Sequence, residues 1–216
     1  MLMASSSGGG VPSLPPMAAL AQARFALHGQ GDPERGEVER FIAGVFARRF
    51  AARVPAFAPI LVSLRDPVDG GIVAAAGYRP ARGGPLFLER YLAAPIESVL
   101  GHHSDAAPAR DVVVEIGHLA ATRPGAGQGL MLLLGPHLEQ QGFHWVVCTL
   151  TRELRHLMLR LGITPLALAK ADPAALPDEA AAWGSYYEHG PVVLAGELRP
   201  ALRRLARRFR AVKGVA

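Results

Sequence analysis

The chain has 216 residues, of which half are apolar and 19% are charged, with a formal net charge of +5, a pI near 10.0 and one cysteine. This length suits a single domain of about 100–200 residues, and the apolar content is enough to fill a core, which excludes wholesale disorder. One cysteine excludes a disulfide scaffold and a cysteine-based zinc site and fits a reducing compartment, so we expect a cytoplasmic protein.

The two ends of the chain differ in composition from its middle. Residues 1–20 are rich in Ser, Gly and Pro and lack a basic leader, so they are expected to form a flexible tail rather than a signal peptide. Residues 198–216 carry seven basic side chains and no acidic one, which leaves the expected domain, 21–197, slightly acidic. The high pI therefore belongs to one terminal segment, and a basic body that coats nucleic acid is excluded. The best apolar run, 130–134, is too short to span a membrane.

The first half of the domain is expected to hold a strand, a helix and a β-hairpin. A strand over 24–27 precedes a helix whose apolar side chains repeat at helical spacing and which Pro55 ends. Two apolar runs, 60–64 and 72–78, flank an Asp-Pro-Val-Asp-Gly-Gly turn and indicate the hairpin. Residues 86–100 combine a strand-like start with a helical finish.

The second half alternates strands and helices, which is an α/β pattern. The expected elements are a strand over 112–119, a helix over 130–141, a strand over 145–149, a helix over 152–161, strands over 163–169 and 191–194, and an amphipathic helix over 198–212.

The glycine-rich loop 121–129 joins the first of these strands to a helix. Its glycines let the backbone approach an anion while the free amides of the first helical turn point at it, so the loop predicts a phosphate cradle. The loop lacks the Gly-Lys-Ser/Thr ending of a P-loop, the acidic residue of a dinucleotide fold and the serine of a nucleophile elbow. By elimination, coenzyme A or phosphopantetheine is the best ligand, and the alternative is an ordinary tight turn.

The loop resembles the pyrophosphate loop of the Gcn5-related N-acetyltransferase (GNAT) fold. The match is Gly127-Gln128-Gly129 with two leucines after it, whereas Pro124 stands where that pattern has Gln or Arg, and Arg123 comes one residue early. The resemblance implies that the cofactor is held by five residues, which are Arg123, Gly125, Gly127, Gln128 and Gly129.

Several spaced blocks resemble the thermostable hemolysin family. They are Phe-Leu-Glu-Arg-Tyr-Leu at 87–92, Val-Glu-Ile-Gly-His-Leu-Ala at 114–120, Trp-Val-Val-Cys-Thr at 145–149, and Ala-Asp-Pro at 171–173 ahead of Trp-Gly-Ser-Tyr-Tyr at 183–187. That family is similar to Gcn5-type acyltransferases and acyl-homoserine-lactone synthases. The resemblance implies an α/β, GNAT-like fold with a mixed, mostly antiparallel sheet flanked by helices.

The resemblance further implies an N-acyltransferase that uses acyl-CoA or a phosphopantetheine thioester on an acyl carrier protein and acts on a small-molecule amine. Two alternatives stay open: a membrane-active, haemolysin-like protein that uses the terminal helix, and a non-catalytic acyl-CoA-binding module. The terminal basic helix suits an acidic carrier protein or an anionic membrane surface. A solvated helix packed by its leucines is the alternative.

Acyl transfer to an amine needs a base, and Glu115 is the first candidate. It lies in the apolar strand that enters the loop, where burial of an unpaired charge is costly, so it needs a partner or a purpose. The alternative is an ion pair with an arginine such as Arg90. His118 is a candidate proton relay or, alternatively, a hydrogen-bonded core residue.

The other candidates bind the acceptor or protonate the leaving group. We assign Glu89 and Arg90 to the acceptor site, with helix capping by Glu89 as the alternative. Met158 stands where Gcn5-type enzymes often carry a general-acid tyrosine, so we expect the hydroxyl of Tyr186 to protonate the thiolate, unless it only packs. No metal is expected, because the adjacent histidines at 102 and 103 lack ligand spacing.

Overall fold

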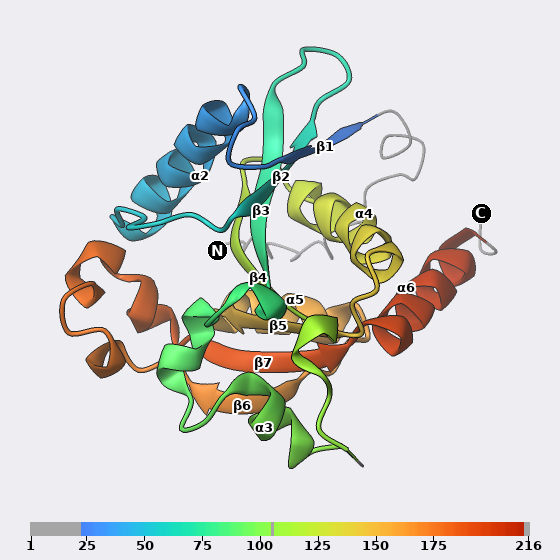
Figure 1. The fold of residues 1–216 in the computed structure, drawn as a ribbon. Helices are drawn as coiled ribbons and strands as arrows, with labels where there is room; N and C mark the ends of the chain where they lie inside the picture. The colour runs from blue at the N-terminus through green and yellow to red at the C-terminus, as the bar shows by residue number, and fades with distance from the viewer. Residues whose placement is uncertain (1–22, 105, 214–216) are drawn as a thin grey trace, which may run out of the picture.

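The computed structural model describes residues 23–104 and 106–213, with side chains up to Arg207. The expected tail, 1–20, and residues 214–216 of the basic terminal segment lie outside the described residues. The described chain forms one seven-stranded sheet in the order β1-β2-β3-β4-β5-β7-β6 (Figure 1). Every pair of neighbours is antiparallel except β4 and β5. The expected α/β class, with a mixed, mostly antiparallel sheet flanked by helices, is confirmed.

The strands of this sheet are β1 (Arg24–His28), β2 (Ile60–Arg65), β3 (Ile72–Pro80), β4 (Val113–Ala121), β5 (Trp145–Leu150), β6 (Leu166–Lys170) and β7 (Val192–Glu197). The α-helices are α2 (Arg35–Phe50), α3 (Ile96–Gly101), α4 (Ala126–Gln140), α5 (Arg152–Arg160) and α6 (Leu198–Lys213). Short 3-10 helices include η2 (Phe87–Tyr91), η5 (Ala180–Trp183) and η6 (Tyr186–His189).

Helices cover both faces of the sheet (Figure 1). On one face, α4 packs Leu130, Leu134 and Leu138 against β2, β3 and β4. On the other face, α2 packs through its buried side, which includes Ile42 and Phe46. Next to α2, η2 and α3 cover the part of this face that β4, β5 and β7 form. The apolar periodicity that predicted the α2 helix is therefore the pattern of its burial.

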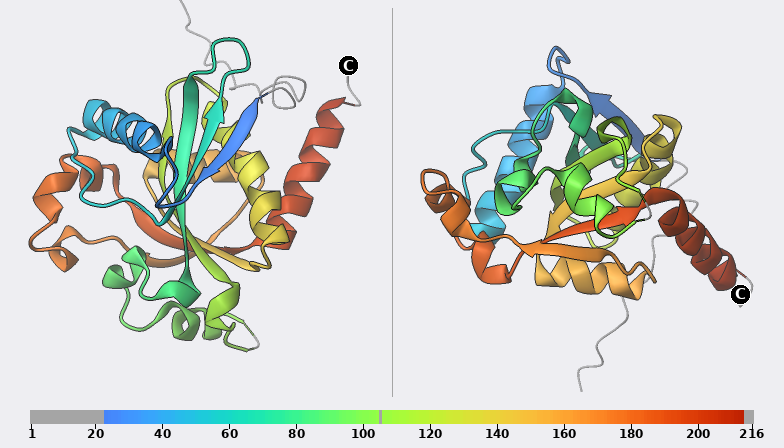
Figure 2. Two further views of the ribbon diagram at one scale, coloured as in Figure 1. Left: turned by 45° about the horizontal axis from the view of Figure 1, so that its top comes forward. Right: turned by 60° about the horizontal axis from the view of Figure 1, so that its bottom comes forward.

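The basic helix α6 lies beside α4 (Figure 2). Leu198 and Leu205 of α6 are buried, and Leu202 packs so closely on α4 that a Cβ at Gly135 would lie 2.7 Å from its Cδ2 atom. The leucine side of α6 thus faces protein, and Arg203, Arg204 and Arg207 are exposed. Among the described residues, no helix has both the length and the apolar character to cross a membrane.

Some element boundaries differ from the sequence expectation. Residues 86–100 form η2 and α3, without the expected strand-like start. Helix α2 stops at Phe50, before Pro55, because Ala51 turns left-handed (φ 53°) and donates its N–H back to Ala47. Helix α4 starts at Ala126, because Gly127 and Gly129 join its first turn instead of the preceding loop.

The parallel pair β4–β5 opens part-way along its length. The two strands are paired from Val113 and Trp145 to Ile116 and Cys148, and both then continue without pairing to each other. A β-bulge follows at once in β4: Gly117 pairs with Gly77 and Ala120 with Ala75, so two residues of β4 lie opposite one of β3. The bulge bends β4 away from β5 and leaves an opening in the sheet.

Candidate active site

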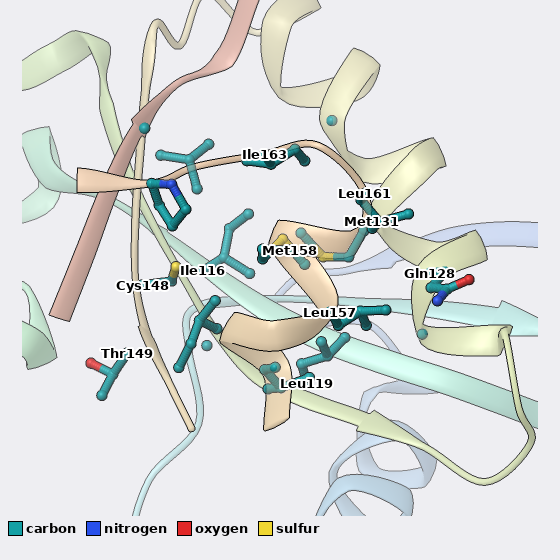
Figure 3. Close-up of a pocket in the computed structure, with 18 of the residues that line it drawn as sticks. Ile116, Leu119, Gln128, Met131, Cys148, Thr149, Leu157, Met158, Leu161 and Ile163 are labelled. Atoms are coloured by element: carbon teal, nitrogen blue, oxygen red, sulfur yellow. The ribbon is translucent and has the colours of Figure 1, made fainter. Parts of the chain in front are cut away.

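A cavity of about 340 Å³ lies at this opening. Helices α4, α5 and α6 and the ends of β4 and β5 form its walls, which are mainly apolar. Figure 3 shows the part of the wall that α4, α5 and the two strands supply. The side chains that point into it include Leu119, Met131, Leu157, Met158 and Leu161. Met158 of α5, which stands at the position where the resemblance led us to look for a general-acid tyrosine, thus lies in the wall of this cavity. The cavity suits an apolar chain.

The start of helix α4 opens onto the same cavity. Gly125 adopts φ 80° as the residue before the helix, a conformation that favours glycine, and the lining includes Gly127 and Gln128. Among the described residues, the N–H groups of Gly127 and Gln128 donate to no backbone carbonyl. The next N–H, that of Gly129, donates to the carbonyl oxygen of Gly125. Two amides at a positive helix end are therefore available to an anion.

Arg123 lines the rim of this cavity, but its guanidinium is bound elsewhere. It pairs with Asp66 and, at 3.4 Å, with Asp69, both in the β2–β3 turn. A phosphate at this position would compete with two carboxylates. Arg49 of α2, which sequence analysis did not single out, also lines the cavity, is exposed and is free of ion pairs with described side chains.

A second cavity of about 90 Å³ adjoins the first. Gly117, His118, Thr149 and Tyr186 line both cavities, so the two meet where β4 and β5 part. Glu115 lines only the second cavity. The structure therefore brings together the three residues expected to do the chemistry, although they come from β4 and from a 3-10 helix far along the chain.

Glu115 is buried, with 8% of its surface exposed. Its Oε2 accepts a hydrogen bond from the N–H of Phe87 at 2.8 Å, and its Oε1 accepts one from Leu88 at 3.0 Å. Burial raises the pKa of this carboxyl, and the two amides oppose the rise. The alternative ion pair with Arg90 is wrong, because Arg90 donates to Glu179 at 2.8 Å instead.

His118 sits in the bulge of β4 with φ 56°, a backbone conformation that is uncommon outside glycine. Its Nε2 lies 3.1 Å from the carbonyl oxygen of Ala56, which only accepts, so Nε2 carries the proton. Its buried Nδ1 lacks a partner among the described residues and packs over Gly77, where a Cβ would approach it to 3.2 Å. Burial lowers the pKa of His118 to about 4, so the ring is neutral at physiological pH.

Tyr186 packs among the rings of Phe46, Phe50 and Trp183. Its hydroxyl donates to the carbonyl oxygen of Thr149 at 3.3 Å. Burial raises the pKa of this hydroxyl, so it keeps its proton. The residue is thus both packed and placed at the junction of the two cavities.

The structure does not bring Glu89 and Arg90 to either cavity. Glu89 accepts from the N–H groups of Leu86 at 2.7 Å and Ile96 at 2.8 Å and pairs with Arg110 at 2.7 Å. Burial would raise the pKa of Glu89, but these hydrogen bonds outweigh it and the pKa is lowered. Glu89 therefore has the capping contacts of the alternative interpretation.

Unpartnered polar atoms gather at the two cavities. Six buried side-chain nitrogen or oxygen atoms lack a hydrogen-bond partner in the described chain, and five of their residues line a cavity: His118, Gln128, Thr149, Thr151 and Trp183. Buried polar groups normally have partners, so this clustering points to a ligand. Cys148 also lines the larger cavity, where burial raises the pKa of its thiol to about 12, which makes it a poor nucleophile.

A mixed sheet whose single parallel pair opens around a cavity, with the start of a helix beside it, is a GNAT-like fold. The solved structures agree. A CoA-dependent acyl-homoserine lactone synthase, BjaI, with SAM and isopentyl-CoA, has a TM-score of 0.59 at 12% identity and covers 86% of this chain and 89% of its own. FeeM, an N-acyl amino acid synthase from uncultured soil microbes, has a TM-score of 0.54 at 11% identity, covering 83% of this chain and 93% of its own.

A putative N-acetyltransferase from Lactobacillus plantarum has a TM-score of 0.50 at 13% identity, with 82% of this chain and 98% of its own covered. At these identities the likeness shows the fold. The model of the thermostable hemolysin family matches residues 28–202, and the chain belongs to that family. A search of curated proteins finds no match.

Proposed function

We propose that the chain is an N-acyltransferase that moves an acyl group from a thioester of coenzyme A or an acyl carrier protein to a small amine. The observation that carries the proposal is the pair of adjoining cavities at the β4–β5 opening. One is apolar and faces the free amides of α4, and the other holds a buried carboxylate. Structurally similar proteins include synthases described as CoA-dependent and as forming N-acyl amino acids.

The larger cavity would take the donor. Gly127 and Gln128 would offer their N–H groups to a phosphate at the start of α4. The facing edges of β4 and β5, unpaired beyond Ile116 and Cys148, would offer backbone groups to the amides of a pantetheine arm. The acyl chain would then lie among the apolar side chains of α4 and α5.

The smaller cavity would take the amine. Glu115 would accept a proton from the amine nitrogen, which attacks the thioester carbonyl carbon. Each oxygen of Glu115 accepts one backbone amide, which leaves a lone pair for the substrate. Backbone N–H groups along the β4 edge would stabilise the developing oxyanion. The carbon–sulfur bond then breaks, and the thiolate takes up a proton, for which Tyr186, which lines both cavities, is the candidate donor.

A donor panel from acetyl-CoA to palmitoyl-CoA, combined with a panel of primary amines, tests this proposal. We expect amine-dependent release of free thiol and, by mass spectrometry, the matching amide. Native mass spectrometry of the purified protein should show a mass increase that equals an acyl thioester. Thiol release that does not depend on the amine would contradict the proposal.

Met158 favours a second candidate, a module that binds acyl thioesters without turnover. A thioether cannot donate a proton, and Met158 lies in the wall of the donor cavity. This candidate predicts saturable acyl-CoA binding by calorimetry with no amide formed from any acceptor. The variant Met158→Tyr, which introduces a hydroxyl at this position, separates the two candidates. Amide formation by the variant but not by the wild type would support the binding module.

A further inference from the structure

We infer that the acceptor is a zwitterionic amino acid, whose carboxylate binds Arg79 and Trp183 and whose ammonium group faces Glu115. This inference rests on the proposed function and names its substrate class. It comes from the arrangement of charge in the smaller cavity.

Arg79 and Glu115 stand directly opposite each other in the β3–β4 ladder, so their side chains leave the sheet on the same face. Both line the smaller cavity. In spite of this register, the two charged groups form no ion pair within 4.0 Å among the contacts of the described chain. One positive and one negative group thus line the same space of about 90 Å³ without pairing with each other.

Most of the N–H donors of the Arg79 guanidinium have no acceptor among the described residues. Its one side-chain hydrogen bond in the described chain is a long contact of 3.4 Å from Nη1 to the carbonyl oxygen of Pro85. A guanidinium has five N–H donors in a planar fork that matches a carboxylate. A half-buried arginine with so little bonding is well suited to bind an anion.

Trp183 supplies a second donor at the same cavity. The residue is 7% exposed, and its Nε1 is buried without a partner among the described residues. The rest of the wall is largely aromatic, with Phe46, Phe87 and Tyr186 in contact with Trp183. Aromatic faces attract an ammonium group, and the neutral ring of His118 adds no repulsion. The cavity therefore offers two donors to a carboxylate, and a carboxylate and aromatic faces to an ammonium.

The reaction balances with this acceptor. The ammonium gives one proton to Glu115, and its nitrogen attacks the thioester carbon. The nitrogen–carbon bond forms, the carbon–sulfur bond breaks, and the nitrogen loses a second proton as the thiolate takes one up. The products are one N-acyl amino acid, one free thiol and one proton released to solvent.

The test compares matched acceptors on the whole chain with a saturating acyl-CoA donor. The acceptors are amino acids, the amines that lack only the carboxylate, such as tyrosine against tyramine, and the amino-acid methyl esters. We expect kcat/KM for the amino acid to exceed that for the amine and the ester by at least about tenfold, since a hydrogen-bonded charge contributes about 1.5–3 kcal/mol.

Two variants locate the preference. In Arg79→Gln, the KM for amino acids should rise by about 10–100-fold, whereas the KM for the amine changes much less. Trp183→Phe keeps the ring and removes the N–H, and it should raise the amino-acid KM alone. The exposed Arg82, which lies outside both cavities, provides the matched control Arg82→Gln, for which we expect no change.

The outcomes distinguish a failure of the amino-acid inference from a failure of the proposed acyltransferase function. Equal use of amines and amino acids, or an equal loss of both in Arg79→Gln, overturns the inference and leaves the acyltransferase in place. No transfer to any acceptor overturns the proposed function and the inference together.

Discussion

Glu115 accepts a hydrogen bond from the N–H of Leu88 at 3.0 Å, although 27 residues separate the two in the chain. This bond, with the one from Phe87, ties the 3-10 helix η2 to strand β4 and fixes the carboxylate at the edge of the smaller cavity. The backbone of η2 thus orients Glu115 as the base of the proposed reaction.

The pH dependence of transfer should report the ionisation of Glu115. Burial raises the pKa of this carboxyl above its usual 4.5, and only the ionised form accepts a proton. Activity should therefore fall as pH drops through the raised pKa, and a plot of kcat/KM against pH should show this acid limb above the usual carboxyl range. His118, with a pKa of about 4, adds no ionisation near neutrality. A limb that persists unchanged in Glu115→Gln would assign it to another group.

Arg110 should stabilise the segment that holds Glu115. It pairs with Glu89 at 2.7 Å and with Glu97 at 2.5 Å and donates to the carbonyl oxygens of Ala81 and Gly84, in the segment just before η2. Arg110→Met removes these ion pairs and hydrogen bonds and should lower the free energy of unfolding by about 1–3 kcal/mol, measured by urea denaturation. Arg90→Met, which breaks an exposed ion pair with Glu179 and a cation–π contact with Phe87, is the matched control and should cost less than about 1 kcal/mol. Equal effects would contradict the assignment.

Gly184 should tolerate no side chain. Its φ is 53°, and a Cβ there would overlap the carbonyl oxygen of Phe50 at the end of α2. Gly184→Ala should cost about 3 kcal/mol or more of unfolding free energy and should weaken binding of the proposed acceptor, because the neighbouring Trp183 lines the smaller cavity. Gly190 has φ 58°, and its nearest contact would be a side-chain nitrogen at 3.5 Å, so Gly190→Ala should cost only about 1–2 kcal/mol. Thermal and urea unfolding check the order.

The exposed arginines of α6 should matter for a protein donor. Arg203, Arg204 and Arg207 face solvent, whereas the leucines of the same helix pack on α4 and line the larger cavity. Reversing the three charges to Glu should lower kcat/KM for an acyl carrier protein donor by at least about tenfold, and more at low salt. The corresponding acyl-CoA should be used almost as before. A loss that is the same for both donors would indicate damage to the cavity and not a docking surface.

Sequence analysis predicts the framework of this molecule better than its site. Apolar periodicity locates α2, and two apolar runs around a turn locate the β2–β3 hairpin. Strand alternation puts Glu115 on the opposite face of β4 from Val114 and Ile116, which pack under α4. The partners of Glu115 are backbone amides of η2, which leave no side-chain pattern in the sequence. The sequence therefore points to a charged side chain such as Arg90 as the alternative partner.

Two further features of the site depend on contacts across the sheet. The positive φ of His118 follows from a bulge that only the β3–β4 register reveals. Arg79 acquires its position opposite Glu115 from the same register, and nothing in its local sequence marks it. Glu89, in contrast, lies three residues after Leu86 and accepts its N–H, which is the helix-capping contact that the sequence offered as the alternative.

The most direct test of the account measures amide formation from acyl-CoA and an amine acceptor by the wild type and by Glu115→Gln, with acyl-CoA binding followed in parallel by calorimetry. The account predicts that the wild type forms the amide and that Glu115→Gln binds the donor with similar affinity but transfers at least about 100-fold more slowly. Wild-type amide formation that survives undiminished in a folded, donor-binding Glu115→Gln would contradict it.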